Sequence, residues 1–186
     1  MIILISGGSG SGKSAYAEDY ITALSQGGSK YYLATMQILD EEGHTKAARH
    51  RMLRKGKGFV TIEQPKDIHL ALGKMAAGQG PDGPKPRTAL LECMSNLVAN
   101  EMFSEETRKS RAEVTDKILF EIGLLGAGLE HLVIVTNNVF EDGVSYHEST
   151  MEYMEAMGQV NEKLAAMADE VTEVVVGIPI RLKEGN

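Results

Sequence analysis

Eight residues near the beginning of the chain match a pattern that binds phosphate groups. They fit G-x-x-x-x-G-K-[ST] at every fixed position and are Gly7, Gly8, Ser9, Gly10, Ser11, Gly12, Lys13 and Ser14. Glycines allow several backbone N–H groups to converge on phosphate oxygens, and a helix that begins here adds its partial positive charge. Lys13 can reach the β- and γ-phosphates of a nucleoside triphosphate, and the Ser14 hydroxyl can ligate Mg²⁺. The pattern therefore predicts a nucleoside triphosphate site; the alternative is a glycine- and serine-rich turn that only ends a strand.

An acidic residue after a second apolar segment is the candidate partner of this loop. Glu92 directly follows residues 89–91, which have the composition of a buried strand. A carboxylate in that position can organise Mg²⁺ and water beside the phosphates, so we expect Ser14 and Glu92 to be metal ligands. The alternative is a solvated carboxylate at a strand end. A GTPase switch protein would need the sequence N-K-x-D after a late strand, and residues 137–140, Asn-Asn-Val-Phe, do not match it.

A basic segment surrounds one of the five histidines. Residues 44–58 contain six of the 19 lysines and arginines of the chain and no acidic residue. His50 has an arginine on each side, and Arg54 follows one helical turn later. Neighbouring cations disfavour a second positive charge, which leaves the His50 imidazole neutral and able to act as a nucleophile. A cationic cluster around a nucleophile suits an approaching triphosphate; the alternative is a solvated basic helix face with an incidental histidine.

The apolar pattern predicts the elements that must position these residues. Strands are expected over residues 2–5, 31–34, 59–63, 88–92, 132–136, 173–176 and 178–182, and helices over 13–25, 40–55, 65–77, 94–103, 107–125 and 149–168. Strands that alternate with helices indicate an α/β fold with a mostly parallel sheet. Gly177 alone, or nearly so, joins the last two strands, which is too short for a parallel crossover, so one of them is expected to be an antiparallel edge strand.

Composition limits the class of protein. The chain has 186 residues, and its Pro- and Gly-rich segment, 78–87, has the length of a loop, so we expect a single domain over 1–186. A single cysteine excludes an internal disulfide framework and a cysteine-rich zinc site. The net charge of −7 argues against general binding of nucleic acid or anionic membranes. No apolar run approaches ~18 residues and the beginning of the chain lacks signal-peptide features, so we expect a cytoplasmic protein without a membrane span.

The chain resembles the bifunctional adenosylcobinamide kinase / adenosylcobinamide-phosphate guanylyltransferase family of cobalamin biosynthesis. Besides the phosphate-binding pattern, the resemblance depends on A-T-x-Q-I-L-D at 34–40, R-H-R at 49–51, A-D-E-V at 168–171 and G-x-P-x-x-L-K at 177–183. It implies two reactions. The kinase step phosphorylates the aminopropanol hydroxyl of adenosylcobinamide with ATP or GTP. The second step transfers GMP from GTP to that phosphate and gives adenosylcobinamide-GDP and pyrophosphate.

The resemblance also implies a fold, an assembly and a set of site residues. The family fold is a RecA-like P-loop sheet, and the family assembles as a homotrimer. GMP passes through a covalent phosphoramidate on a histidine, and the matching position is His50. The family's nucleotide contacts correspond to residues 7–14 and to Ala34, Thr35, Met36, Arg51, Met52, Leu53, Arg54, Glu63 and Glu92.

The sequence leaves open how the corrinoid substrate is held and which of several functions the chain has. Residues 137–148 depart from the family pattern and lack its proline, which bears on how the corrinoid substrate is held. That substrate is large and largely apolar, so we expect it at a subunit interface or under a loop. Two other functions compete with the leading hypothesis: a kinase of the same fold that acts on another small alcohol or nucleotide without guanylyl transfer, and a non-enzymatic nucleotide-binding switch or assembly subunit.

Overall fold

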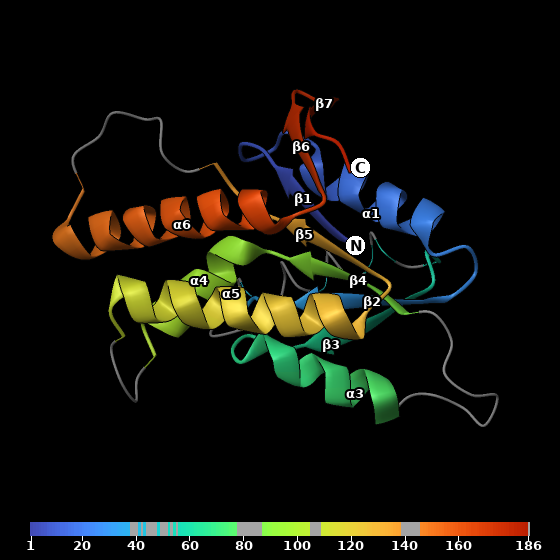
Figure 1. Ribbon diagram of the computed structural model, residues 1–186, viewed down its shortest axis with the longest axis horizontal. Helices are drawn as coiled ribbons and strands as arrows, with labels where there is room; N and C mark the ends of the chain where they lie inside the picture. Colours follow the sequence, from blue (N-terminus) through green and yellow to red (C-terminus); the bar gives the residue numbers. More distant parts are fainter. Residues whose placement is uncertain are drawn as a thin grey trace.

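The computed structural model describes residues 1–37, 41, 43, 48, 52, 54, 56–77, 87–104, 109–138 and 146–185. Within these residues, strands form one sheet in the order β3-β2-β4-β5-β1-β6-β7 (Figure 1). They are β1 (Ile2–Ser6), β2 (Ser29–Ala34), β3 (Phe59–Glu63), β4 (Arg87–Glu92), β5 (His131–Val135), β6 (Glu170–Val175) and β7 (Ile178–Lys183). Every neighbouring pair is parallel except β6 and β7. The predicted α/β fold with one antiparallel edge strand is therefore confirmed.

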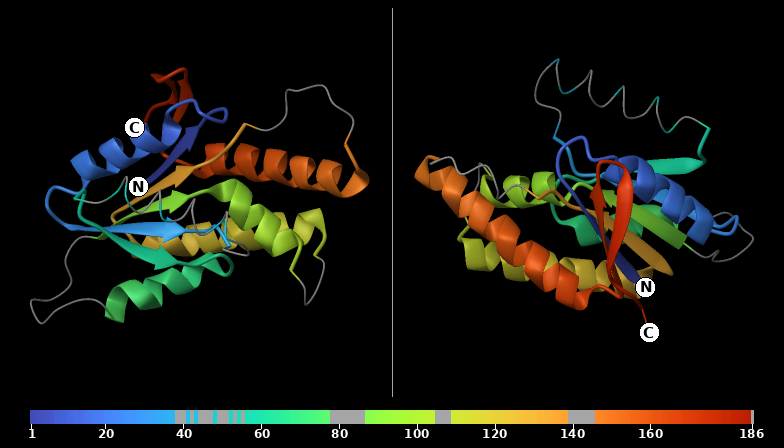
Figure 2. Two further views of the ribbon diagram at one scale, coloured as in Figure 1. Left: turned by 180° about the vertical axis from the view of Figure 1, so that it is seen from behind. Right: turned by 90° about the horizontal axis from the view of Figure 1, so that it is seen from above.

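Helices cover both faces of this sheet. α1 (Lys13–Leu24) packs on one face, and α3 (Ala71–Ala77), α4 (Met94–Met102), α5 (Arg111–Gly128) and α6 (Glu148–Met167) lie on the other (Figures 1 and 2). Ile3 and Ile5 of β1 belong to the buried cluster on the α1 side, whereas Leu4 belongs to the larger cluster on the opposite side. Because both faces are buried, the central strands are nearly continuous apolar runs.

A hairpin ends the sheet at β7. β6 and β7 are joined by Val176 and Gly177, with φ angles of +45° and +84°. Positive φ at both central residues is the pattern of a type I′ turn, whose twist matches that of antiparallel strands. The antiparallel pairing expected from the short connection is present, although β6 begins at Glu170, three residues earlier than predicted.

Two predicted helices have wrong boundaries. The helix expected from Pro65 begins only at Ala71, after a 3₁₀ turn over Ile68–Leu70. Asp67 has a φ angle of +50°, and the Gln64 side chain donates to the Lys66 carbonyl, so the backbone here cannot continue one helix. The helix expected over 107–125 spans Arg111–Gly128. Its start is fixed by a capping box, in which Ser110 and Glu113 each bond to the other's backbone N–H.

The helix expected over 40–55 lies largely outside the described residues. The glycines that were expected to end it, Gly56 and Gly58, have φ angles of +88° and +76°, conformations in which helices commonly terminate. None of the helices in the described ranges has the length and apolar character needed to cross a membrane.

Candidate active site

The phosphate-binding pattern forms the connection between β1 and α1. β1 ends at Ser6, and α1 begins at Lys13 with Gly12 as its N-cap residue. Gly10 and Gly12 have φ angles of +73° and +91°, a left-handed conformation that favours glycine. The first N–H groups of a helix have no partner within it, so this turn presents hydrogen-bond donors and the positive end of the helix dipole to an anion.

The loop is packed against the hairpin at the sheet edge. A Cβ atom on Gly7 would lie 2.6 Å from the Val174 carbonyl oxygen, so no side chain fits at this position. The Gly177 N–H donates to the Ser11 carbonyl at 2.8 Å. The turn between β6 and β7 therefore supports the loop from one side, a contact that the sequence analysis did not predict.

Lys13 lies inside the loop. Its side chain is largely buried, and its ammonium donates to the Gly8 carbonyl at 2.9 Å. Burial lowers the pKa of this ammonium, and the nearby Cys93 and Glu92 offset that effect only in part. A cation held by the loop backbone in this way is positioned for the β- and γ-phosphates of a bound nucleotide.

Ser14 and Glu92 meet although they lie 78 residues apart in the sequence. The Ser14 hydroxyl donates to Oε1 of Glu92. The contact arises because α1 packs across β5 and β4, which brings its first turn to the carboxyl end of β4. A hydroxyl and a carboxylate oxygen side by side fit the hard oxygen ligands that Mg²⁺ takes in phosphoryl-transfer sites.

Tyr32 and Arg54 extend this cluster. The Tyr32 hydroxyl donates to Oε2 of Glu92 at 3.1 Å, and burial together with the Glu92 charge raises the pKa of the Tyr32 phenol. The Arg54 guanidinium lies over the Tyr32 ring, with 3.4 Å between its carbon and the ring centroid. Arg54 is only 6% exposed, yet its Nε and one terminal nitrogen have no hydrogen-bond partner. Buried unpaired donors of an arginine are costly, and an anionic ligand would satisfy them.

Four other predicted nucleotide contacts lie at or directly after the carboxyl ends of β2 and β3, beside Glu92: Ala34, Thr35, Met36 and Glu63. Ala34, the last residue of β2, is in register with Glu63 on β3 and with Glu92 on β4. The Thr35 N–H donates to the Glu92 carbonyl at 3.2 Å, and its hydroxyl exchanges hydrogen bonds with the Cys93 backbone. Met36 follows directly and is half-buried, whereas Met52 is exposed.

Three predicted site residues lie outside the described residues. They are His50, the expected nucleophile, and Arg51 and Leu53, two expected nucleotide contacts.

A polar network beside the loop was missed as a site feature. The Thr136 hydroxyl donates to the Asn161 side-chain oxygen at 2.6 Å, and the Asn161 amide donates to the Asn137 carbonyl at 3.2 Å. The Asn137 amide in turn donates to the Ser95 hydroxyl at 2.8 Å. The network joins the end of β5 to α4 and α6. Its signal in the sequence is the pair Thr136-Asn137 directly after an apolar strand.

A known protein family matches almost the whole chain. The family model described as cobinamide kinase / cobinamide phosphate guanyltransferase matches residues 3–182. The chain belongs to this family. The match runs from β1 to β7 and so includes the phosphate-binding loop, Glu92 and the basic segment with His50. The resemblance inferred from the sequence motifs is thereby confirmed.

Relatives match the chain over almost its whole length. The bifunctional adenosylcobalamin biosynthesis proteins CobU of Escherichia coli and Salmonella typhimurium are 33% and 32% identical to it, over 98% of this chain and all of theirs. CobP of Pseudomonas aeruginosa is 28% identical over 97% of this chain and 96% of its own. The fold is also that of a solved ATPase domain, with a TM-score of 0.54, 11% identity, and coverage of 92% of this chain and 68% of that one.

Proposed function

We propose that the chain is a bifunctional enzyme that phosphorylates cobinamide and then transfers GMP from GTP to the phosphate. The two activities are those in the description of its family. The observation that carries the proposal is the contact between Ser14 and Glu92 beside the buried ammonium of Lys13. A turn without catalytic function has no need for a desolvated cation and a hydroxyl–carboxylate pair at one place.

In the kinase step, the loop holds the β- and γ-phosphates through its backbone N–H groups and Lys13. Ser14 and Glu92 would hold Mg²⁺, which neutralises charge on the phosphate oxygens when bound. The aminopropanol hydroxyl oxygen of the acceptor attacks the γ-phosphorus, the bond from that phosphorus to the β–γ bridging oxygen breaks, and the hydroxyl proton is released. ADP or GDP leaves. This step needs no protein nucleophile.

In the guanylyl step, His50 acts as the nucleophile. A nitrogen of its neutral imidazole attacks the α-phosphorus of GTP, and pyrophosphate leaves. A phosphate oxygen of the phosphorylated acceptor then attacks the same phosphorus, the P–N bond breaks and His50 is restored. The buried, unpaired nitrogens of Arg54 support an anion at this end of the basic segment.

We extend the proposal to the nucleotide contacts and the assembly. Residues 7–14 and Ala34, Thr35, Met36, Arg51, Met52, Leu53, Arg54, Glu63 and Glu92 contact the nucleotide. The single domain of residues 1–186 assembles as a homotrimer in the cytoplasm. Light scattering on the purified protein measures the subunit number, and a monomeric mass contradicts the trimer.

Labelled GTP tests the covalent step. With GTP labelled at the α-phosphate, the wild type acquires label that is stable to base and removed by acid, as a phosphoramidate is. His50→Ala acquires none and loses guanylyl transfer, but it retains kinase activity because direct phosphoryl transfer needs only positioning and the metal. His147→Asn is the matched control, since asparagine can replace the histidine that caps α6. Unchanged labelling of His50→Ala overturns the route through His50, whereas a wild type that acquires no label favours a kinase without guanylyl transfer.

A further inference from the structure

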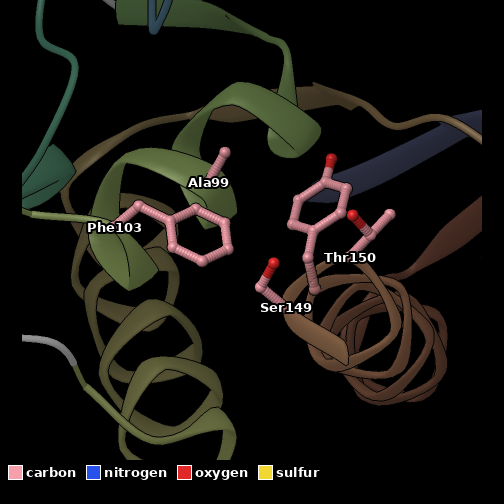
Figure 3. Close-up of a pocket in the computed structure, with 5 residues that line it drawn as sticks. Ala99, Phe103, Ser149 and Thr150 are labelled. Atoms are coloured by element: carbon pink, nitrogen blue, oxygen red, sulfur yellow. The ribbon is translucent and has the colours of Figure 1, made fainter. Parts of the chain in front are cut away.

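A pocket opens between the end of α4 and the beginning of α6. Ala99 and Phe103 of the α4 side and Ser149, Thr150 and Tyr153 of α6 line it, and its volume is about 270 Å³. Figure 3 shows the Phe103 ring extending from α4 toward Ser149 and Thr150 on the opposite helix. The two helices thus contribute opposite walls of one cavity.

The lining has a distinct chemistry. It combines two methyl groups and two aromatic rings with three hydroxyl groups, and these five residues include no charged side chain. Phe103 is 47% exposed, so its ring forms an open wall rather than part of the core. Apolar walls with a few hydrogen-bonding groups bind neutral organic groups, not phosphates.

Two hydrogen bonds and a short stretch of chain connect this pocket to the phosphate site. The Tyr153 hydroxyl donates to the Ser95 carbonyl at 3.2 Å, and burial raises the pKa of this phenol above its ordinary value. Ser95 follows Glu92 by three residues, and three residues of chain span at most about 11 Å. Glu92 accepts the hydrogen bond from Ser14. The pocket therefore lies near enough for one large substrate to occupy it and present a distant hydroxyl to the γ-phosphate.

We propose that this pocket between α4 and α6 binds the acceptor, by holding peripheral amide side chains and an adjacent apolar edge of its corrin ring. The inference rests on the proposed function, which makes a cobinamide the acceptor. Amide arms are neutral and offer both donors and acceptors, which matches the hydroxyls of Ser149 and Thr150. The apolar edge of the macrocycle matches the Phe103 ring. The volume suits a few such arms and leaves the rest of the ring outside the cavity.

Filling the pocket tests the proposal. Ala99→Phe places a third aromatic ring in the cavity, and we expect the KM for cobinamide in the kinase reaction to rise at least about tenfold, while the KM for the nucleotide is unchanged. The matched control is Ala76→Phe on α3, an exposed alanine on another helix, which leaves both KM values unchanged. A role limited to folding would lower activity toward both substrates together.

A second variant covers the case in which Ala99→Phe does not fold. Phe103→Ala removes an exposed wall without opening a cavity in the core, and the same selective rise in the KM for cobinamide is expected. If the wild type phosphorylates cobinamide and both folded variants keep its KM, the pocket assignment is wrong and the proposed function stands. If the wild type does not phosphorylate cobinamide at all, the proposed function itself fails.

Discussion

At the level of single residues, Lys13 carries a charge that the fold does not favour. Burial lowers the pKa of its ammonium, so the charged form costs free energy in the folded state. We expect Lys13→Met to raise the free energy of unfolding at neutral pH, because the desolvated charge is gone and the apolar stem remains. Both activities should fall by a factor on the order of 10² or more, because each draws on the triphosphate held here. Thermal unfolding and the two activity assays measure these opposite effects; a loss of stability together with activity contradicts the prediction.

The charge of Glu92 can be removed while its hydrogen bonds are kept. Glu92→Gln keeps a side chain of the same shape that can still bond with Ser14 and Tyr32, but it removes the charge that would bind Mg²⁺. We expect the Mg²⁺ concentration for half-maximal kinase activity to rise at least about tenfold and kcat to fall on the order of 10²-fold. Glu130→Gln, at an exposed position before β5, is the control. An unchanged Mg²⁺ dependence would falsify the role of Glu92 as a metal ligand.

Residue-level predictions were most specific where a motif fixes both residue type and spacing. The loop and Lys13 could be assigned from eight consecutive residues, and Glu92 from its place after an apolar strand. The contact between Ser11 and Gly177 could not be predicted, because it joins segments that are distant in the chain and involves only backbone atoms. The Tyr32 hydroxyl on Glu92 was missed for a similar reason: an aromatic residue in a strand gives no sign of which carboxylate it will reach.

At the level of elements, the hairpin between β6 and β7 contains a strained residue. Val176 has a φ angle of +45° and is 84% exposed. A β-branched residue in the left-handed region costs about 1–3 kcal/mol. We expect Val176→Asn to raise the free energy of unfolding by about 1 kcal/mol, because asparagine tolerates this conformation. Urea unfolding measures the change.

A substitution at the neighbouring glycine is expected to have the opposite effect on the free energy of unfolding. Gly177 has a φ angle of +84° and no atom within 4 Å of where a Cβ would lie, so Gly177→Ala introduces backbone strain without a steric clash. It is expected to lower the free energy of unfolding by about 1 kcal/mol. Equal stability of both variants and the wild type shows that the turn is not strained.

Strands were easier to predict than helix boundaries. Every strand of the sheet overlaps a segment that was predicted as a strand, although β6 begins three residues earlier. The pattern is clearest in β1, β4 and β5, because burial on both faces leaves a continuous apolar run. The start of α5 was misplaced although its signal, Ser110-Arg111-Ala112-Glu113, is a capping box that can be read in the sequence. The segment after Pro65 was assigned to a helix because nothing local announces the left-handed conformation of Asp67.

At the level of the whole molecule, the order of the strands could not be predicted. Periodicity shows that a segment is a buried strand but not which strand lies beside it. β5 lies between β1 and β4, and α1 must cross it for Ser14 to meet Glu92. The sequence therefore indicated the candidate residues, and the non-local topology determines which of them touch.

One ionic network connects three elements on the side of the sheet opposite α1. Glu101 of α4 and Glu121 of α5 are buried, and Lys117 of α5 bonds to Glu101 and to Asp67, the latter at 2.6 Å. The carboxylates also accept backbone bonds from the segment after β3: Asp67 N–H to Glu101 and Ile68 N–H to Glu121, each at 2.9 Å. The network thus fixes the backbone that follows Glu63 against two helices.

We expect this network to make the stability of the protein depend on pH. Burial alone would raise the pKa of Glu101, but hydrogen bonds from Lys109, Lys117 and the Asp67 N–H outweigh it and hold the pKa below its ordinary value of 4.5. A carboxyl with a lowered pKa stabilises the fold above its unfolded-state pKa, and this contribution is lost as the pH falls through the folded-state value. We therefore expect the wild type to lose stability as the pH falls from about 5 toward 3.

Lys117→Met tests the same network by removing one of its ammonium groups. It leaves Glu101 buried with one ammonium fewer, and we expect the free energy of unfolding to fall by about 2–3 kcal/mol at pH 7, since breaking a buried ion pair leaves a charge uncompensated. The deficit should shrink near pH 4, where protonation of Glu101 in the variant removes that charge. Lys163→Met, which removes an exposed pair with Asp116 at 3.5 Å, is the control and should change stability little at either pH. A deficit for Lys117→Met that is the same at pH 7 and pH 4 would mean that lost packing of the lysine stem, not the charge of Glu101, accounts for it.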